Sequence, residues 1–128
     1  MDTQTTQGVQ VTVTTNYLPD YSSPVQQHFV FAYKINIQNN SEFTVKLLRR
    51  YWQIFDSNGT VREVEGEGVV GQQPTLEPGE SHQYVSGCNL KTGIGKMTGH
   101  YTMERLVDGR EFKVNIPEFV LIVPYKLN

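Results

Sequence analysis

The chain has 128 residues, which fits one domain with one hydrophobic core, and we expect that domain to span residues 1–128. A formal charge of −2 argues against a general nucleic-acid-binding protein, and a single cysteine excludes an internal disulfide. No apolar run approaches the roughly 20 residues that span a bilayer, and no secretory leader is visible, so we expect a cytoplasmic protein without membrane insertion.

Apolar and polar side chains alternate along most of the chain with the period of two that is typical of β-strands. The first run holds Val9, Val11 and Val13, and the clearest one extends from Phe29 to Ile37. The same pattern predicts further strands over residues 48–55, 61–65, 81–85, 97–103 and 112–116. Hairpin turns are expected at Asn58-Gly59 and Asp108-Gly109, and a bulge or sheet edge at Pro117.

About seven short strands separated by turn residues predict an all-β fold, an antiparallel β-sandwich of the immunoglobulin or fibronectin type III kind. No window of the sequence shows the apolar stripe of a helix. We expect a flexible loop over residues 18–27, which contain two prolines, and loose ends at residues 1–7 and 125–128.

Three glycines in the stretch from Glu65 to Gly71 have the G-x-G-x-x-G spacing of loops that bind phosphate. In a nucleotide-binding fold a helix follows this motif, but residues 72–79 hold two prolines and a glycine, which do not build a helix. Residues 62–80 also carry one basic and five acidic side chains, a formal charge of −4 that would repel a phosphate. The motif therefore does not predict a nucleotide fold.

Two interpretations of the motif remain open. Either Gly66, Gly68 and Gly71 adopt positive φ angles or allow another strand to approach closely. Alternatively, their N–H groups form a small backbone nest for pyrophosphate or a nucleotide anion, with Arg49 and Arg50 one strand away offsetting the acids.

The strand over residues 48–55 presents two different faces. Alternation places Leu48, Arg50, Trp52 and Ile54 on one face, where the tryptophan is expected to fill the core. The other face carries Arg49, Tyr51, Gln53 and Phe55, a basic and aromatic combination that is enriched at interfaces. Tyr51 and Phe55 are thus candidates for an interaction surface, unless a loop covers them.

No residue pattern predicts catalysis or metal binding. His28, His82 and His100 are spread along the chain without ligand spacing, and Cys88 has no neighbouring cysteine partner. The Ser86-Gly87-Cys88 turn is not a nucleophile elbow. We therefore expect no catalytic residue, no metal site, no cofactor and no enzymatic activity.

Several longer motifs resemble the bacterial ApaG family, in order and over nearly the whole chain. They are the segments 50–54, 56–59, 63–74, 76–80, 84–88 and 95–103, among them Arg-Tyr-Trp-Gln-Ile and Gly-Lys-Met-Thr-Gly-His-Tyr-Thr-Met. The resemblance implies a fibronectin type III-like sandwich and a link to cobalt and magnesium resistance or efflux. Related domains look like protein-binding modules, and their glycine motif has been proposed as a nucleotide or pyrophosphate site.

These observations lead to two hypotheses. The first is a non-enzymatic module that binds a partner protein through its sheet faces and the glycine loop, and affects divalent-cation homeostasis indirectly. The alternative is a protein that binds a small anion, pyrophosphate or a dinucleoside polyphosphate, at the loop from Gly66 to Gly71.

Overall fold

The computed structural model describes residues 1–124, which are almost entirely β-strand. The strands are β1 (Asp2–Thr6), β2 (Val9–Tyr17), β3 (Phe29–Asn39), β4 (Val45–Asp56), β5 (Val61–Glu67), β6 (Thr75–Leu76), β7 (Ser81–Leu90), β8 (Ile94–Arg105) and β9 (Arg110–Ile122). Two short 3-10 helices, η1 (Pro19–Tyr21) and η2 (Pro24–Gln26), lie between β2 and β3. None of the helices in these residues is long and apolar enough to cross a membrane.

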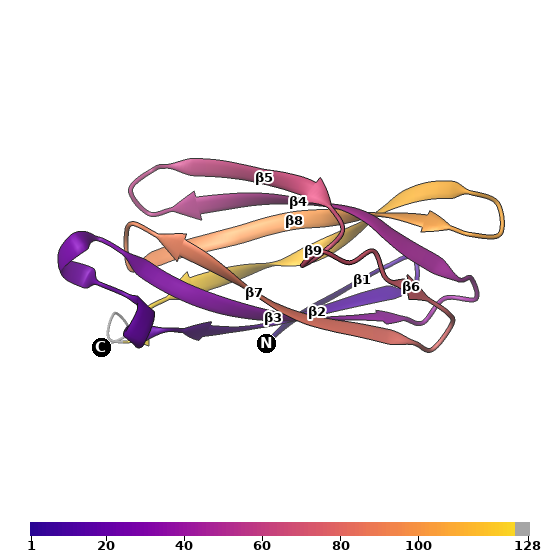
Figure 1. The fold of residues 1–128 in the computed structure, drawn as a ribbon, viewed down its shortest axis with the longest axis horizontal. Helices are drawn as coiled ribbons and strands as arrows, with labels where there is room; N and C mark the ends of the chain where they lie inside the picture. The colour runs from indigo at the N-terminus through magenta and orange to yellow at the C-terminus, as the bar shows by residue number, and fades with distance from the viewer. Residues whose placement is uncertain (125–128) are drawn as a thin grey trace.

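The strands form two antiparallel sheets that pack face to face (Figure 1). One sheet has the order β1-β2-β3-β7, and the other has the order β5-β4-β8-β9 with β6 paired to one end of β4. The predicted all-β antiparallel sandwich is confirmed. Its sheets hold β1 and β6 in addition to the seven strands expected, and β1 lies within residues 1–7, which were expected as a loose end. The expectation for residues 125–128 lies outside the described residues.

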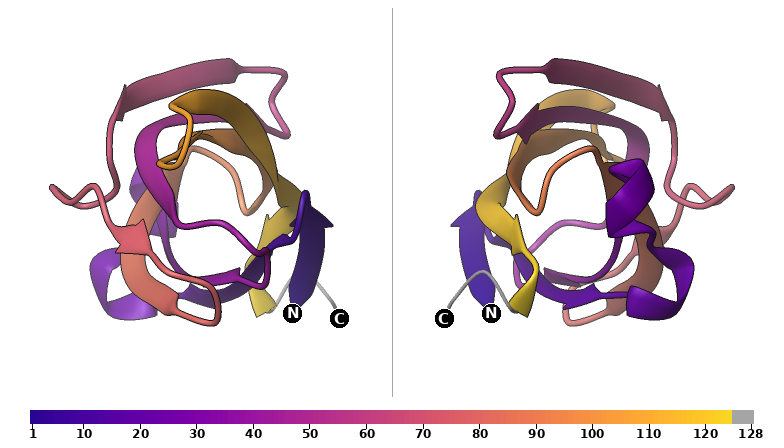
Figure 2. Two further views of the ribbon diagram at one scale, coloured as in Figure 1. Left: turned by 90° about the vertical axis from the view of Figure 1, so that its right-hand side faces the viewer. Right: turned by 90° about the vertical axis from the view of Figure 1, so that its left-hand side faces the viewer.

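The two long sides of the sandwich differ. On one side β1 lies against β9, and the Asn115 N–H donates to Thr6 Oγ1 at 3.2 Å, so the two sheets nearly close (Figure 2). On the other side β5 and β7 are the outer strands of their sheets. There the Arg62 guanidinium reaches across and donates to the Asn89 carbonyl.

The core is a single cluster of buried side chains from both sheets. At its centre the rings of Tyr33, Trp52 and Phe119 pack edge to face or tilted, with centroids 5.5 to 5.8 Å apart. Each such aromatic pair adds about 0.5–1.5 kcal/mol beyond its area burial. The predicted inward position of Trp52 is therefore confirmed.

Leu48 does not share the buried face of Trp52, which corrects the alternation expected for this strand. A bulge shifts the register of β4 against β8 between Leu47 and Arg49, and an extra residue in one strand reverses the alternation beyond it. Leu47 consequently points into the core and is 1% exposed, while Leu48 is only half-buried.

The turn predictions are confirmed. Asn58-Gly59 lies in the β4–β5 connection and Asp108-Gly109 in the β8–β9 connection, and both glycines have positive φ. Pro117 lies at a second bulge, where Pro117 and Glu118 of β9 together face Thr98 of β8. Residues 18–27 contain η1 and η2, and the Val30 N–H of β3 donates to the Ser22 hydroxyl at 2.9 Å, which holds this segment against the sheet.

Candidate functional site

The outer face of the β5-β4-β8-β9 sheet carries the aromatic side chains that the sequence singles out. Because Trp52 and Ile54 point into the core, the alternate residues Tyr51 and Phe55 point outward, and so does Arg49. The register places Tyr51 between Glu65 and His100 of the neighbouring strands. We call this surface the outer face.

Tyr51 and His100 form a stacked pair at the middle of the outer face. Their ring centroids lie 5.1 Å apart at an interplanar angle of 28°. Partial desolvation, and then the charge of Lys113 on β9, lower the pKa of His100 below its ordinary value. The imidazole is therefore neutral at neutral pH. Desolvation, followed by the Glu63 carboxylate, raises the pKa of the Tyr51 hydroxyl.

Phe55 borders a shallow apolar recess at one end of the outer face. The recess has a volume of about 340 Å³, and Phe55, Ile94 and Val120 are its apolar walls. The Lys96 ammonium lies 5.1 Å from the centroid of the Phe55 ring. Ile94 and Val120 are 40% and 55% exposed. The sequence analysis missed both residues, because only the registers of β4 against β8 and of β8 against β9 bring them next to Phe55.

A row of acidic side chains lies along β5, the edge strand of this sheet. Glu63, Glu65 and Glu67 alternate along β5 and share the outer face, since they pair with its outward residues on β4. None of the three forms an ion pair within residues 1–124. Charged side chains on an edge strand discourage pairing with another chain, and an unpaired acidic row also favours a basic partner.

The glycine loop continues from β5 into a tight turn and not into a helix. Val69 and Gln72 exchange two backbone hydrogen bonds of 2.8 and 3.0 Å, which close a two-residue turn around Val70 and Gly71. Val70 has φ +47° and Gly71 has φ +77°, the signs of a type I′ turn. Val69 is buried in the core and anchors the turn, while Val70 is 62% exposed.

Each glycine of the motif meets a local constraint. A Cβ at Gly66 would lie 3.1 Å from both terminal nitrogens of the Arg50 guanidinium, so Gly66 leaves room for that side chain. Gly68 has φ +64°, and a Cβ there would lie 2.2 Å from the Gln72 carbonyl oxygen. Gly71 faces open space, and its positive φ is what the turn requires.

The structure brings Arg50, but not Arg49, to the glycine loop. The Arg50 guanidinium donates to the carbonyls of Glu67 and Gly68, both at 3.0 Å, whereas Arg49 lies on the outer face. The Gly68 N–H donates to the Leu48 carbonyl at 2.8 Å. Within residues 1–124 the N–H groups of Val70 and Gly71 have no hydrogen-bond partner.

Cys88 lies in the core at the inner side of β7, and residues 86–88 are part of this strand and not the turn that the sequence suggested. Burial raises the pKa of its thiol, and the nearby Arg62 guanidinium opposes that shift only in part. The thiol stays protonated at neutral pH, which is unlike an activated nucleophile. No group of three or more histidine, cysteine, aspartate or glutamate side chains that could hold a metal lies within the part of the chain that the structure describes.

Comparison with known proteins agrees with this architecture and with the motifs in the sequence. The family model of the ApaG domain matches residues 19–105. Protein ApaG of Brucella canis is 51% identical over 119 residues, which are 93% of this chain and 91% of that protein, and Protein ApaG of Brucella anthropi is 53% identical over the same shares. A crystal structure named for an ApaA protein of Bordetella pertussis superposes with a TM-score of 0.87 at 46% identity, covering 91% of this chain and 94% of that one. The chain therefore belongs to the ApaG family.

Proposed function

We propose that this protein is a non-enzymatic module that binds a partner protein through the outer face. The observation that carries the proposal is the apolar recess beside Phe55, which lies on the same face as the half-buried Tyr51–His100 stack. Aromatic anchors next to an apolar pocket are the usual centre of a protein–protein interface.

The charges of the outer face indicate the chemistry of the partner. The acidic row on β5 lies next to the aromatic residues of β4 and has no basic partner within residues 1–124. A complementary surface would insert an apolar side chain into the recess and place lysine or arginine side chains opposite Glu63 and Glu65. The glycine loop lies at the end of β5 and would contribute the rim of the same contact.

An affinity capture with matched variants tests this proposal. The Tyr51→Ala, Phe55→Ala double variant should lose partners that the unmodified protein recovers from a bacterial extract. The control is Thr14→Ala, Lys34→Ala, a cross-strand pair of exposed residues on the other sheet. Circular dichroism verifies that both variants fold. Equal recovery of the same partners by all three proteins would rule out the outer face as the interface.

We further propose that an effect of this protein on cobalt or magnesium tolerance is indirect and passes through the partner. Calorimetry with Co²⁺ should then give no tight site on the isolated protein. A stoichiometric site of about micromolar affinity would overturn the indirect role.

Binding of pyrophosphate or a nucleotide at the glycine loop is the second candidate. Its support is the pair of adjacent N–H groups of Val70 and Gly71, which have no hydrogen-bond partner in residues 1–124. Pyrophosphate and ATP, titrated separately to about 5 mM, should shift the amide signals of residues 66–71 if this function holds. Unchanged spectra at that concentration would exclude it.

A further inference from the structure

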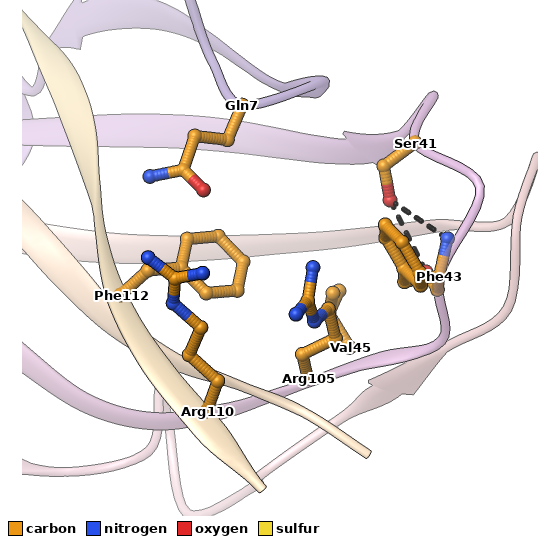
Figure 3. A pocket seen from close by; sticks show the side chains of 7 residues that line it. All are labelled: Gln7, Ser41, Phe43, Val45, Arg105, Arg110 and Phe112. Atoms are coloured by element: carbon orange, nitrogen blue, oxygen red, sulfur yellow. Dashed lines mark hydrogen bonds between the residues drawn. The ribbon is translucent and has the colours of Figure 1, made fainter. Parts of the chain in front are cut away.

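A small cavity with two arginines lies at the end of the sandwich where three connections meet. The β1–β2 turn contributes Gln7, the β3–β4 connection contributes Phe43, and the strand ends at the β8–β9 turn contribute Arg105 and Arg110 (Figure 3). The cavity has a volume of about 220 Å³. It shares no lining residue with the outer-face recess or with the pocket beside the glycine loop.

The two arginines and the nearby Asp108 leave a net positive charge at this cavity. Arg105 and Arg110 are directly opposite each other in the β8–β9 ladder, a position in which like charges are unfavourable. Arg105 is held in an ion pair with Asp108. Arg110 has no ion-pair partner within residues 1–124, and its guanidinium points into the cavity beside the Gln7 amide (Figure 3). An anion placed between the guanidiniums would relieve their repulsion.

Apart from Ser41, the remaining walls of the cavity are apolar. The Phe112 ring is partly buried against the core, and Val45 is 2% exposed. The centroid of the Phe43 ring lies 4.3 Å from the Arg105 Cζ atom, so the ring already covers one face of this guanidinium. A ligand that fits must therefore combine an anionic group with an apolar one.

The cavity is preorganised by a buried side chain. Asn39, which is 0% exposed, donates from Nδ2 to the carbonyls of Phe43 and Leu76 at 2.7 and 2.9 Å. Its Oδ1 accepts hydrogen bonds from the N–H and the hydroxyl of Ser41. These bonds fix the connection that carries Phe43, so its ring is positioned before a ligand arrives.

We propose that this cavity binds a carboxylate attached to an apolar side chain, as in the C-terminal residue of a peptide or in a free aromatic acid. A planar guanidinium can hold a carboxylate by two parallel hydrogen bonds, and Arg110 is free to do so. The volume is below the 300–1,000 Å³ that is usual for drug-sized ligands, which suits a single residue. This inference is independent of the outer-face proposal, since the two surfaces share no residue.

Amide NMR with matched probes tests the inference. N-acetylphenylalanine should shift the signals of Gln7 and Phe112 at low-millimolar concentration, and N-acetylphenylalaninamide, which lacks the carboxylate, should not. Arg110→Gln should weaken binding of the acid about tenfold or more, as expected for loss of a charged hydrogen-bond donor. Arg49→Gln, which removes an exposed arginine from the outer face, should leave binding unchanged.

Further probes distinguish a peptide C-terminus from a free acid as the source of the carboxylate, and they define the results that would contradict the proposal. A short peptide ending in phenylalanine that binds more tightly than N-acetylphenylalanine would identify a chain terminus as the ligand, and equal or weaker binding would identify the free acid. Equal binding of the acid and the amide, equal binding by Arg110→Gln, or no shift at about 10 mM acid would overturn the proposal. Inorganic phosphate should bind more weakly than N-acetylphenylalanine, because it lacks an apolar group. If phosphate displaces the acid at equal concentration, the apolar part of the proposal is wrong.

Discussion

At the scale of single residues, the glycine loop shows that one motif can serve three separate steric needs. Gly66 makes room for the Arg50 guanidinium, Gly68 lets the backbone pass close to Gln72, and Gly71 supplies a left-handed turn position. The guanidinium in turn binds the carbonyls of Glu67 and Gly68. The spacing that resembles a phosphate loop therefore coincides with the entry to a two-residue hairpin.

Alanine substitutions should distinguish these needs. Gly71→Ala should lower the free energy of unfolding by about 1–2 kcal/mol, the cost of a left-handed φ for a residue with a Cβ. Gly68→Ala should cost more, because it adds a contact of 2.2 Å with the Gln72 carbonyl oxygen to the same φ penalty. Urea denaturation of both variants measures the difference, and equal losses would contradict the close approach at Gly68.

Val70 is a β-branched residue in a left-handed conformation, with φ +47°, and its side chain is largely exposed. Asparagine followed by glycine is the preferred pair for a type I′ turn. Val70→Asn should therefore raise the free energy of unfolding by about 0.5–1 kcal/mol. The check is the urea midpoint, with the exposed Val107→Asn in the β8–β9 turn as control; an unchanged or lowered midpoint for Val70→Asn would show that its backbone is not strained.

At the scale of elements, alternation predicts the faces of β4 well on one side of its bulge and not on the other. From Arg50 to Phe55 the sequence correctly separates the inward Trp52 from the outward Tyr51. The bulge near Leu48 could not be predicted from the sequence, because a register shift depends on how two strands pair and not on the residue pattern of one strand. The same limit applies to Ile94 and Val120, whose contact with Phe55 comes from cross-strand register.

Two strands of opposite sheets meet through a buried tyrosine pair, Tyr84 of β7 and Tyr101 of β8, whose hydroxyls are hydrogen-bonded. Burial raises the pKa of both above the ordinary value of tyrosine. In the unfolded chain these hydroxyls ionise near pH 10, while the folded chain keeps their protons. The stability that they contribute is therefore fully present below pH 10 and is lost as the pH rises above it.

This pair predicts a steep alkaline limit. The free energy of unfolding should be nearly constant from pH 7 to about 8 and decline slightly as the Cys88 thiol of the unfolded chain ionises. Above about pH 10 it should fall steeply, by about 1.4 kcal/mol per pH unit for each buried tyrosine. Urea denaturation across this range, with Tyr84→Phe as the variant that removes one ionising group, measures the slope. Tyrosinate absorbance that appears for every tyrosine of the native protein near pH 10 would contradict the prediction.

At the scale of the whole molecule, the sequence predicts the fold class but not the arrangement that creates the arginine cavity. Period-two patterns and turn residues were sufficient for an antiparallel sandwich. Gln7, Phe43 and Arg110, however, come from segments far apart in the chain, and only the packing of the sheets brings them together. The family resemblance likewise fixes the architecture without naming a ligand.

Strand β1 has a role that its composition did not indicate. It pairs with β2 over five residues and lies against β9, yet its side chains are mostly exposed. Deletion of residues 1–7 should leave the sandwich folded but less stable, because it uncovers the edge of β2 and removes the bond from Asn115 to Thr6. Urea denaturation measures the loss and sedimentation velocity detects association through the uncovered edge; unchanged stability without association would contradict this role.

The pairing of β3 with β7 also sets the order in which the protein can be completed during synthesis. Phe29 pairs with Leu90 and Val45 pairs with Arg105, so neither sheet can be assembled from the first half of the chain alone. Until about residue 90 has left the ribosome, the nascent chain can form only the β1-β2-β3 meander and the pairings of β4 with β5 and β6, with their apolar faces uncovered, and the β4–β8 pairing must wait until about residue 105. Such non-local pairing slows folding and lengthens the time during which those faces are open to other chains.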